Sequence, residues 1–274
     1  MKRMRLVVWN MARAFPPAGV SVDPWSVLDS LQPDIALLQE CQPRAEPHTG
    51  GNFYYSPTRR GWGTGVWSRW ELSDCGPFPS ALSNEWDRYR GALDGYIASA
   101  CVRVMDTLDL HVTSVHAYPA TVPNECLEGF DVDAIRLPSA LAIWPGDLVW
   151  WAFRGSAQAS TPAIIGGDWN TARLFDKTYG PRGNSEFFER MVSAGWCEIA
   201  RQFHAEEVQT YFKAGKGPYQ LDHVFAGALL GEAAVRFDVV RSEPVLAVSD
   251  HAALLVEFDL TKLATAGSPF LTKT

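Results

Sequence analysis

Polar side chains capable of metal or phosphate chemistry end six of the apolar runs in this sequence. In chain order, the runs end at Asn10, Glu40, His116, Asp168 with Asn170, Asp222, and Asp250 with His251. For any one of them alone, the favoured explanation is a strand reaching water. Together they supply oxygen ligands of the kind Mg²⁺ takes, and imidazoles that transfer protons or contact a phosphoryl oxygen. The pattern predicts that these side chains meet at one edge of the sheets.

The spacing around Asp168 adds detail to this prediction. An extended backbone would place Asp168 and Asn170 on one side and Trp169 on the other. The glycines at 166–167 permit close approach of the backbone just before them. The same alternation places Asp222 on one face with Gln220. It places His223 on the other face, so His223 is interpreted as a packed structural histidine.

The elements that must position these residues are short strands with helices at irregular intervals. Strands are expected over residues 5–9, 34–38, 64–68, 96–104, 108–116, 163–165, 209–212, 220–225, 237–240 and 252–258. Asp23 and Pro24 are typical of a helix start, and a helix through 185–194 is expected to end at Gly195. This order favours an α/β (α+β) fold of mixed sheets with outer helices, in one domain rather than two.

Five short motifs resemble, in order and approximate spacing, the signature of the endonuclease/exonuclease/phosphatase superfamily. They are Trp9-Asn10, Gln39-Glu40, Gly167-Asp168-Trp169-Asn170, Leu221-Asp222-His223 and Ser249-Asp250-His251. The resemblance spans residues 5 to about 260. It implies a four-layer α/β sandwich of two packed mixed β-sheets flanked by helices. The expected domain covers residues 1–262, and residues 263–274 are expected to form a flexible tail.

The resemblance also implies roles for the metal and water side of the site. Glu40 resembles the main Mg²⁺ ligand, with Asn10 and Asp250 as direct or water-mediated ligands, and Mn²⁺ is an expected substitute. Asp168 resembles the group that orients and deprotonates the attacking water. Asn170 resembles a donor to that water or to the scissile phosphate.

The histidines receive their expected roles from the same resemblance. His251 resembles the imidazole that contacts the phosphate, held in its tautomer by Asp222. His116 resembles the second histidine of the deoxyribonuclease and sphingomyelinase branches. A divalent cation and a cationic imidazole can stabilise the charge that develops during attack on a phosphoester.

Composition limits the class of protein. The formal net charge of −7 argues against binding nucleic acid by charge alone, although a bound cation can still bring phosphate to an acidic pocket. Five scattered cysteines without a CxxC pair disfavour a disulfide framework and a thiolate zinc site, and predict a reducing cytoplasm. No apolar run approaches the length of a membrane span, so stable membrane insertion is not expected.

Three regions carry weaker signals. Residues 45–63 form an expected flexible loop with aromatic and arginine residues, and a phosphate-binding lip and a solvated loop are equally favoured. Arg90 could reach a phosphate bidentately and is the substrate-binding candidate, although a surface salt bridge is the more frequent use of such a residue. The long connection at 117–162 contains an expected helix capped at Asp147, whose apolar character favours core packing.

The leading hypothesis is a Mg²⁺-dependent nuclease that hydrolyses phosphodiester bonds in DNA or RNA by metal-assisted water attack. The alternative is a phosphatase or phosphodiesterase acting on a nucleotide, inositol phosphate or lipid headgroup. A non-catalytic binding module on the same fold is disfavoured, because every key motif position is occupied. The expected partner is therefore nucleic acid or another phosphoester substrate, and the oligomeric state is left open.

Overall fold

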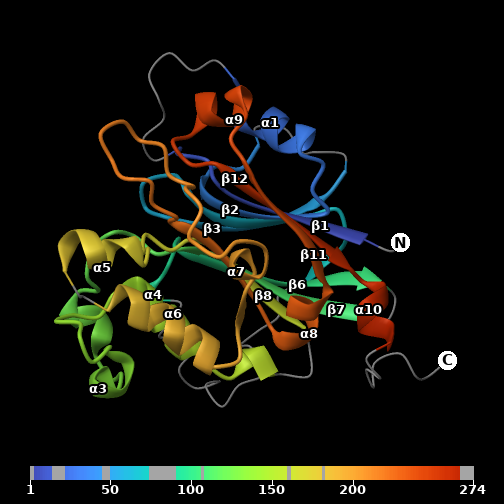
Figure 1. Cartoon of the computed structure of the whole chain (residues 1–274). Coiled ribbons are helices and arrows are strands. Elements are labelled where there is room, and N and C mark those ends of the chain that lie inside the picture. The colour runs from blue at the N-terminus through green and yellow to red at the C-terminus, as the bar shows by residue number, and fades with distance from the viewer. Residues whose placement is uncertain are drawn as a thin grey trace.

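The computed structural model describes residues 3–13, 22–44, 50–73, 91–105, 108–158, 162–180 and 183–265. Two β-sheets face each other, and helices cover their outer sides (Figure 1). The first sheet has the strand order β11-β12-β1-β2-β4-β3, and the second has the order β5-β6-β7-β8-β10-β9. This arrangement confirms the predicted sandwich of two mixed sheets flanked by helices.

The first sheet combines the two ends of the chain. Its strands are β1 (Arg3–Asn10), β2 (Ile35–Cys41), β3 (Asn52–Pro57), β4 (Gly63–Ser68), β11 (Ala234–Val240) and β12 (Ala253–Asp259). β1 pairs parallel with β2 and antiparallel with β12, whereas the remaining pairs are antiparallel. The parallel pair brings the ends of β1 and β2 to the same edge of the sheet.

The second sheet is built from the middle of the chain. Its strands are β5 (Leu72–Ser73), β6 (Ile97–Met105), β7 (Leu108–His116), β8 (Ala163–Asp168), β9 (Cys197–Glu198) and β10 (Asp222–Ala226). β7 and β8 are parallel, and β10 runs antiparallel to β8. The end of β7, the end of β8 and the start of β10 therefore lie side by side.

The core has three layers because the central strands bury both faces. In β1, Leu6 and Val8 pack between the sheets, whereas Val7 and Trp9 pack outward. Such strands read as continuous apolar runs rather than as alternating ones. This explains why the run before Asn10 has no polar face.

Helices close the outer layers. α1 (Pro24–Ser30) and α9 (Glu243–Val248) cover the first sheet. α4 (Pro145–Phe153) and α6 (Asn184–Ser193) cover the second. Asp23 caps α1 as predicted, since its side chain accepts hydrogen bonds from the first-turn amides. The smaller helices are α3 (Val132–Ile135), α5 (Leu174–Tyr179), α7 (Ala200–Phe203), α8 (Ala228–Ala233) and α10 (Thr261–Thr265).

Several predicted elements differ from the structure. Within the loop expected over 45–63, residues 52–57 form β3, an edge strand whose partly exposed side chains blur its apolar pattern. The strand expected over 209–212 is reduced to one isolated bridge between Tyr211 and His251. The helix expected to be capped at Asp147 is capped three residues earlier, at Trp144, because Asp147 lies in the first turn and its side chain accepts from the Trp144 amide.

The last described helix spans the position of the expected C-terminal boundary. α10 extends to Thr265, and its Leu263 is buried at 6% exposure. The boundary expected after residue 262 thus falls inside a packed helix, while residues 266–274 lie outside the described part. None of the described helices has the length and hydropathy needed to cross a bilayer.

Candidate functional site

Strand register brings the predicted polar residues together. His116 and Asp222 are both register partners of Asp168, one on each side of β8. In the other sheet, Asn10 at the end of β1 lies opposite Gln39, one residue before Glu40. The polar ends of both sheets therefore meet at one end of the sandwich.

Two site residues have left-handed backbone conformations. Glu40 has φ of 44° and Asn170 has φ of 46°, values that residues other than glycine rarely adopt. Such conformations are costly and cluster at functional sites. At Glu40 the β2–β4 pairing shifts register between Leu38 and Cys41. At Asn170 the turn replaces the extended backbone expected there, and Asn170 nevertheless reaches Asp168.

The amide and carboxylate side chains form one hydrogen-bonded group. The Asn10 Nδ2 donates to Asp168 Oδ2 at 3.0 Å and to Glu40 Oε1 at 3.3 Å. The Asn170 Nδ2 also donates to Asp168 Oδ2, at 3.0 Å, and its backbone amide donates to Asp168 Oδ1 at 2.9 Å. Asn10 therefore holds carboxylates of the two sheets near each other. Its Oδ1 accepts from the Ala12 amide at 2.9 Å.

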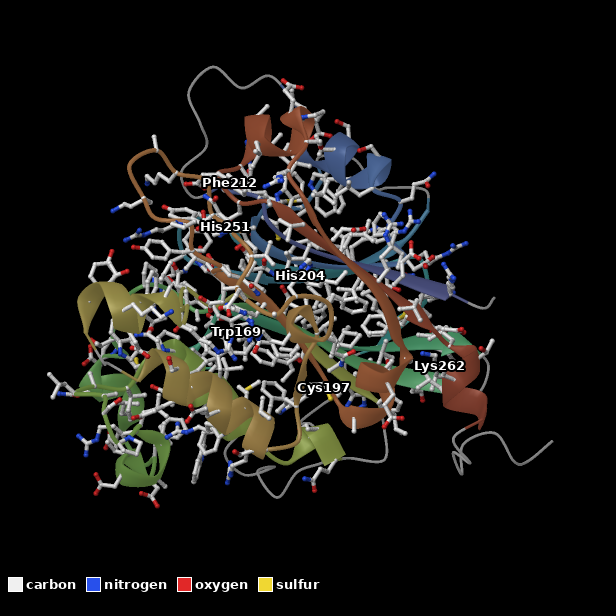
Figure 2. All side chains as sticks on the ribbon, in the orientation of Figure 1. Trp169, Cys197, His204, Phe212, His251 and Lys262 are labelled. Carbon is white, nitrogen blue, oxygen red and sulfur yellow. The ribbon has the colours of Figure 1, made fainter. Side chains whose placement is uncertain are left out.

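Polar contacts hold both the ring and the backbone of His251. Its Nδ1 lies 2.9 Å from Asp222 Oδ2, and its Nε2 lies 3.8 Å from Asp168 Oδ2. Its backbone amide donates to Ser249 Oγ, whose hydroxyl donates to the Asn10 carbonyl at 2.7 Å. In Figure 2, His251 and Trp169 lie on the side of the molecule opposite Lys262.

His116 approaches the same carboxylates from β7. Its Nε2 lies 3.6 Å from Glu40 Oε1 and 3.8 Å from Asp168 Oδ2. The rings of Trp62 and Tyr96 pack against its imidazole at centroid distances of 5.5 and 5.7 Å. This aromatic shell buries the ring to 4% exposure.

The pKa values of the two histidines are shifted in opposite directions. Burial lowers the pKa of His116 from its ordinary value, and Asp168 only partly opposes that effect. Burial would also lower the pKa of His251, but Asp222 and Asp168 outweigh it and raise the pKa to about 10. Burial raises the pKa of Asp168 against the opposing charge of His251. Neighbouring groups with separated pKa values are characteristic of sites that hold an acid and a base.

Asp250 lies at the edge of this group. Its carboxylate raises the pKa of His251, and burial together with Asp250 raises the pKa of Tyr211 to about 12. Asp168 and Glu40 also raise that pKa. The Tyr211 ring packs on the His251 ring at 5.0 Å. The phenol of Tyr211 thus faces the same acidic group.

The donor set fits a hard divalent cation. Asp168, Asp222 and His251 offer ligand atoms within 4.8 Å of one another, and Glu40 adds a partly exposed carboxylate beside Asp168. Within the described residues, the buried Asp222 Oδ1 has no hydrogen-bond partner. Carboxylate oxygens are the ligands that Mg²⁺ and Ca²⁺ prefer. Both oxygens of Asp168 and the Oδ2 of Asp222 already take part in hydrogen bonds, whereas Glu40 presents a partly exposed carboxylate.

His223 lies outside the group, in agreement with its interpretation as a structural histidine. It is fully buried and contacts Gln220 at 3.1 Å, the Thr171 carbonyl at 3.1 Å and Glu198 at 3.4 Å. The expectation that Gln220 shares a face with Asp222 is wrong, because β10 begins at Asp222 and strand alternation does not extend back to 220. Arg90, the substrate-binding candidate, lies outside the described residues.

Two residues that support the site were missed by the sequence reasoning. The Thr210 hydroxyl donates to Asp222 Oδ2 at 2.6 Å and accepts from the Asp222 amide at 3.1 Å. Tyr211 follows it and packs on His251. Both lie in the segment where the sequence predicts an ordinary strand, and no local pattern marks either of them as part of the site.

The fold and the site together define a class of protein. Its members have two facing β-sheets, with carboxylate, amide and histidine side chains gathered at one end. The model of the endonuclease/exonuclease/phosphatase family matches residues 8–251. The chain belongs to this family, so the predicted family resemblance and the assignment to a family of phosphoester hydrolases are confirmed. A comparison with curated protein sequences gives no match.

Solved structures share the fold at low sequence identity. The catalytic domain of Xenopus laevis APE2 has a TM-score of 0.65 at 17% identity, covering 93% of this chain and 92% of that one. The AP endonuclease LMAP from Leishmania major has a TM-score of 0.62 at 15% identity, covering 94% and 88%. The 3'-5' exonuclease NExo from Neisseria meningitidis has a TM-score of 0.59 at 16% identity, covering 93% and 100%. These similarities concern the fold alone.

Proposed function

We propose that the protein is a Mg²⁺-dependent nuclease that hydrolyses phosphodiester bonds in DNA or RNA, with Mn²⁺ as a substitute metal. The observation that carries the proposal is that Asn10 and His116 each contact both Glu40 and Asp168, in a group that joins the ends of both sheets. Two of the similar structures are an AP endonuclease and a 3'-5' exonuclease, which favours nucleic acid as the substrate.

Glu40 and Asp250 would hold the metal ion, with Asn10 and Asp168 beside them. When bound, a divalent cation supplies positive charge to the phosphoryl oxygens and makes an oxygen nucleophile more accessible at neutral pH. The side-chain amide of Asn10 donates to both Glu40 and Asp168, so Asn10 contributes to the site by positioning these two carboxylates. Its Oδ1 already accepts a hydrogen bond from the Ala12 amide, which favours a water-mediated rather than a direct contact with the ion.

Asp168 is the proposed base that orients and deprotonates the attacking water. Its Oδ2 is the point on which both histidines and two amides converge. Asn170 donates to Asp168 and borders the space where a phosphate would lie. Losing one preorganised donor of this kind typically costs roughly 10²–10³ in rate.

His251 is the proposed contact to the scissile phosphate. The bond from its Nδ1 to Asp222 leaves Nε2 to face Asp168 and the reacting group. His116 contacts the same oxygen from β7 and is a second hydrogen-bonding partner for the phosphate. A reducing cytoplasm remains the proposed location, supported by four free cysteines among the described residues.

A cleavage assay tests this proposal. Labelled single-stranded DNA, duplex DNA with and without an abasic site, RNA and supercoiled plasmid are incubated with Mg²⁺, Mn²⁺ or EDTA. His251→Ala should abolish cutting, and His204→Ala is the matched control, because His204 packs on Phe237 away from the acidic group. Cutting in EDTA, or equal cutting by His251→Ala, contradicts the proposal.

The same assay separates the alternative. If no nucleic acid is cut but small phosphoesters are hydrolysed with metal, the protein is a phosphatase or phosphodiesterase acting on a nucleotide, inositol phosphate or lipid headgroup. If neither class is hydrolysed with either metal, the enzymatic proposal is wrong.

A further inference from the structure

A pocket of about 250 Å³ opens beside the acidic group. Its inner wall begins one residue after the two strand ends of the site. Ala117 follows His116 at the end of β7, and Trp169 follows Asp168 at the end of β8. The other walls come from α4, α5 and α6, which lie together on one side of the molecule (Figure 1).

Aromatic side chains dominate the lining. They are Tyr118, Trp144, Trp169, Phe175, Tyr179 and Phe187. Trp144 and Tyr179 are unusual because they remain 41% and 52% exposed although they are large and apolar. Side chains of this kind at the mouth of a concave site are typical of ligand contact rather than core packing.

The polar part of the lining is uncharged apart from one carboxylate. No Lys or Arg belongs to the described lining, and Asp147 is its one ionisable acid. Asp147 is 2% exposed and caps the Trp144 amide. A headgroup with additional phosphates would need arginine or lysine partners. The described part of the lining therefore suits an uncharged part of a substrate.

Asn170 links the pocket to the site. It lines the pocket, and its amide donates to Asp168 Oδ2 at 3.0 Å. A group in the pocket is thus the immediate neighbour of a phosphate placed at Asp168. In a nucleotide, the uncharged, flat group is the base, and the sugar joins it to the phosphate.

We propose that this pocket binds the nucleobase of the nucleotide that carries the scissile phosphate, stacked against Trp144 and Tyr179. The proposal rests on the proposed function and narrows its substrate class. Stacking of bases on aromatic side chains tolerates all sequences, because every base has a flat face. The lining offers Thr171 and Asn184 for edge contacts, and these two already share a hydrogen bond of 2.8 Å.

A base that is held in this pocket cannot remain paired with a base of a second strand. Taking a base out of a duplex costs a few kcal/mol, and least where it is already unpaired. The pocket therefore predicts preference for single-stranded nucleic acid, frayed ends or mononucleotide-sized esters over the interior of a duplex.

Ligand-observed saturation-transfer NMR on the whole chain tests binding without metal or turnover. The probes are the four nucleoside 5′-monophosphates, ribose 5-phosphate and monomeric dihexanoylphosphatidylcholine, all in EDTA. The base protons of at least one nucleotide should receive the strongest saturation, and Trp144→Ala and Tyr179→Ala should each reduce it. Phe203→Ala, an aromatic of similar exposure (38%) on α7, is the control.

Kinetics supply the second measurement. Trp144→Ala should lower kcat/KM on single-stranded oligonucleotide by about 5- to 100-fold, and should leave the rate on an oligonucleotide that is abasic at the cleaved position within about twofold.

The outcomes separate the two proposals. The pocket assignment is overturned if Trp144→Ala lowers the rate on intact and abasic oligonucleotides equally, or if saturation of nucleotide bases persists in both variants. Neither result contradicts the proposed function. Saturation of acyl protons that depends on Trp144, without saturation of any base, assigns the pocket to a lipid chain instead. Failure to hydrolyse any phosphoester refutes the proposed function, whatever the NMR result.

Discussion

Replacing Glu198 by Gln is expected to destabilise the protein and to flatten its response to acid. Glu198 lies in β9 at 5% exposure. It accepts from both terminal nitrogens of Arg173, at 3.1 and 2.5 Å, and lies 3.4 Å from His223 Nδ1. His223 is the residue after Asp222, so this buried network lies directly behind the candidate site.

The magnitude follows from the pKa of Glu198. Burial alone would raise it, but the hydrogen bonds from His223 and Arg173 outweigh burial and lower the pKa from 4.5 to about 2. At 1.36 kcal/mol per tenfold change in acidity, this corresponds to about 3 kcal/mol of stability. Burial would lower the pKa of His223, but Glu198 outweighs burial and raises that pKa. The two shifts describe one interaction and are not added together.

The sign of the pH dependence is opposite for the two partners. The depressed pKa of Glu198 means that its contribution is complete above pH 4.5 and is lost as the pH falls toward about 2. The raised pKa of His223 means that its contribution is complete below 6.5 and is lost as the pH rises through the folded-state value. Glu198→Gln should remove both slopes.

Urea unfolding from pH 2.5 to pH 9 measures this prediction. At pH 6 the variant should lose about 3 kcal/mol of unfolding free energy, with the deficit shrinking toward pH 2.5. The exposed Glu206→Gln removes the same charge from a neighbouring loop and should change stability by less than about 0.5 kcal/mol. A deficit that does not vary with pH, or one equal to that of the Glu206 variant, would refute the reasoning.

Three further predictions concern the site itself. Asp222→Asn removes the charged acceptor 2.9 Å from His251 Nδ1 and should lower kcat by about 10- to 100-fold with the circular dichroism spectrum unchanged; an unaltered kcat would exclude this positioning role. Glu40→Gln should raise the Mg²⁺ concentration for half-maximal rate by about tenfold or more, and an unchanged metal titration would remove Glu40 from the ligand set. Gly167→Ala would put a Cβ 1.8 Å from the Val115 carbonyl oxygen and should cost about 3 kcal/mol or more in urea unfolding; a near-neutral change would contradict the β7–β8 packing.

Much of the site could be predicted because its signals are local. A buried strand reads as an apolar run, and the first polar residue after it marks the end of the strand. This rule identified Asn10, Glu40, His116 and Asp168, which the structure brings into contact. The order of the motifs then identified the family, since several weak local patterns in sequence order carry more information than any one of them.

The remaining features depend on which segments become neighbours. Edge strand β3 escaped prediction because its partly exposed side chains have no clear pattern and pairing with β4 determines its form. Thr210 and Tyr211 have no local mark of function, and acquire one only where the chain passes Asp222 and His251.

The sequence by itself therefore determined the fold family and the chemical types at the ends of the strands, because burial periodicity and motif order are properties of consecutive residues. Only the tertiary structure decided that Asn10 joins Glu40 to Asp168, that His223 turns away to Glu198, and that an aromatic pocket opens beside Asn170. Each of these depends on strand register and on helix packing between segments far apart in the chain. Their physical cause is the pairing of the strands and the closure of the two sheets.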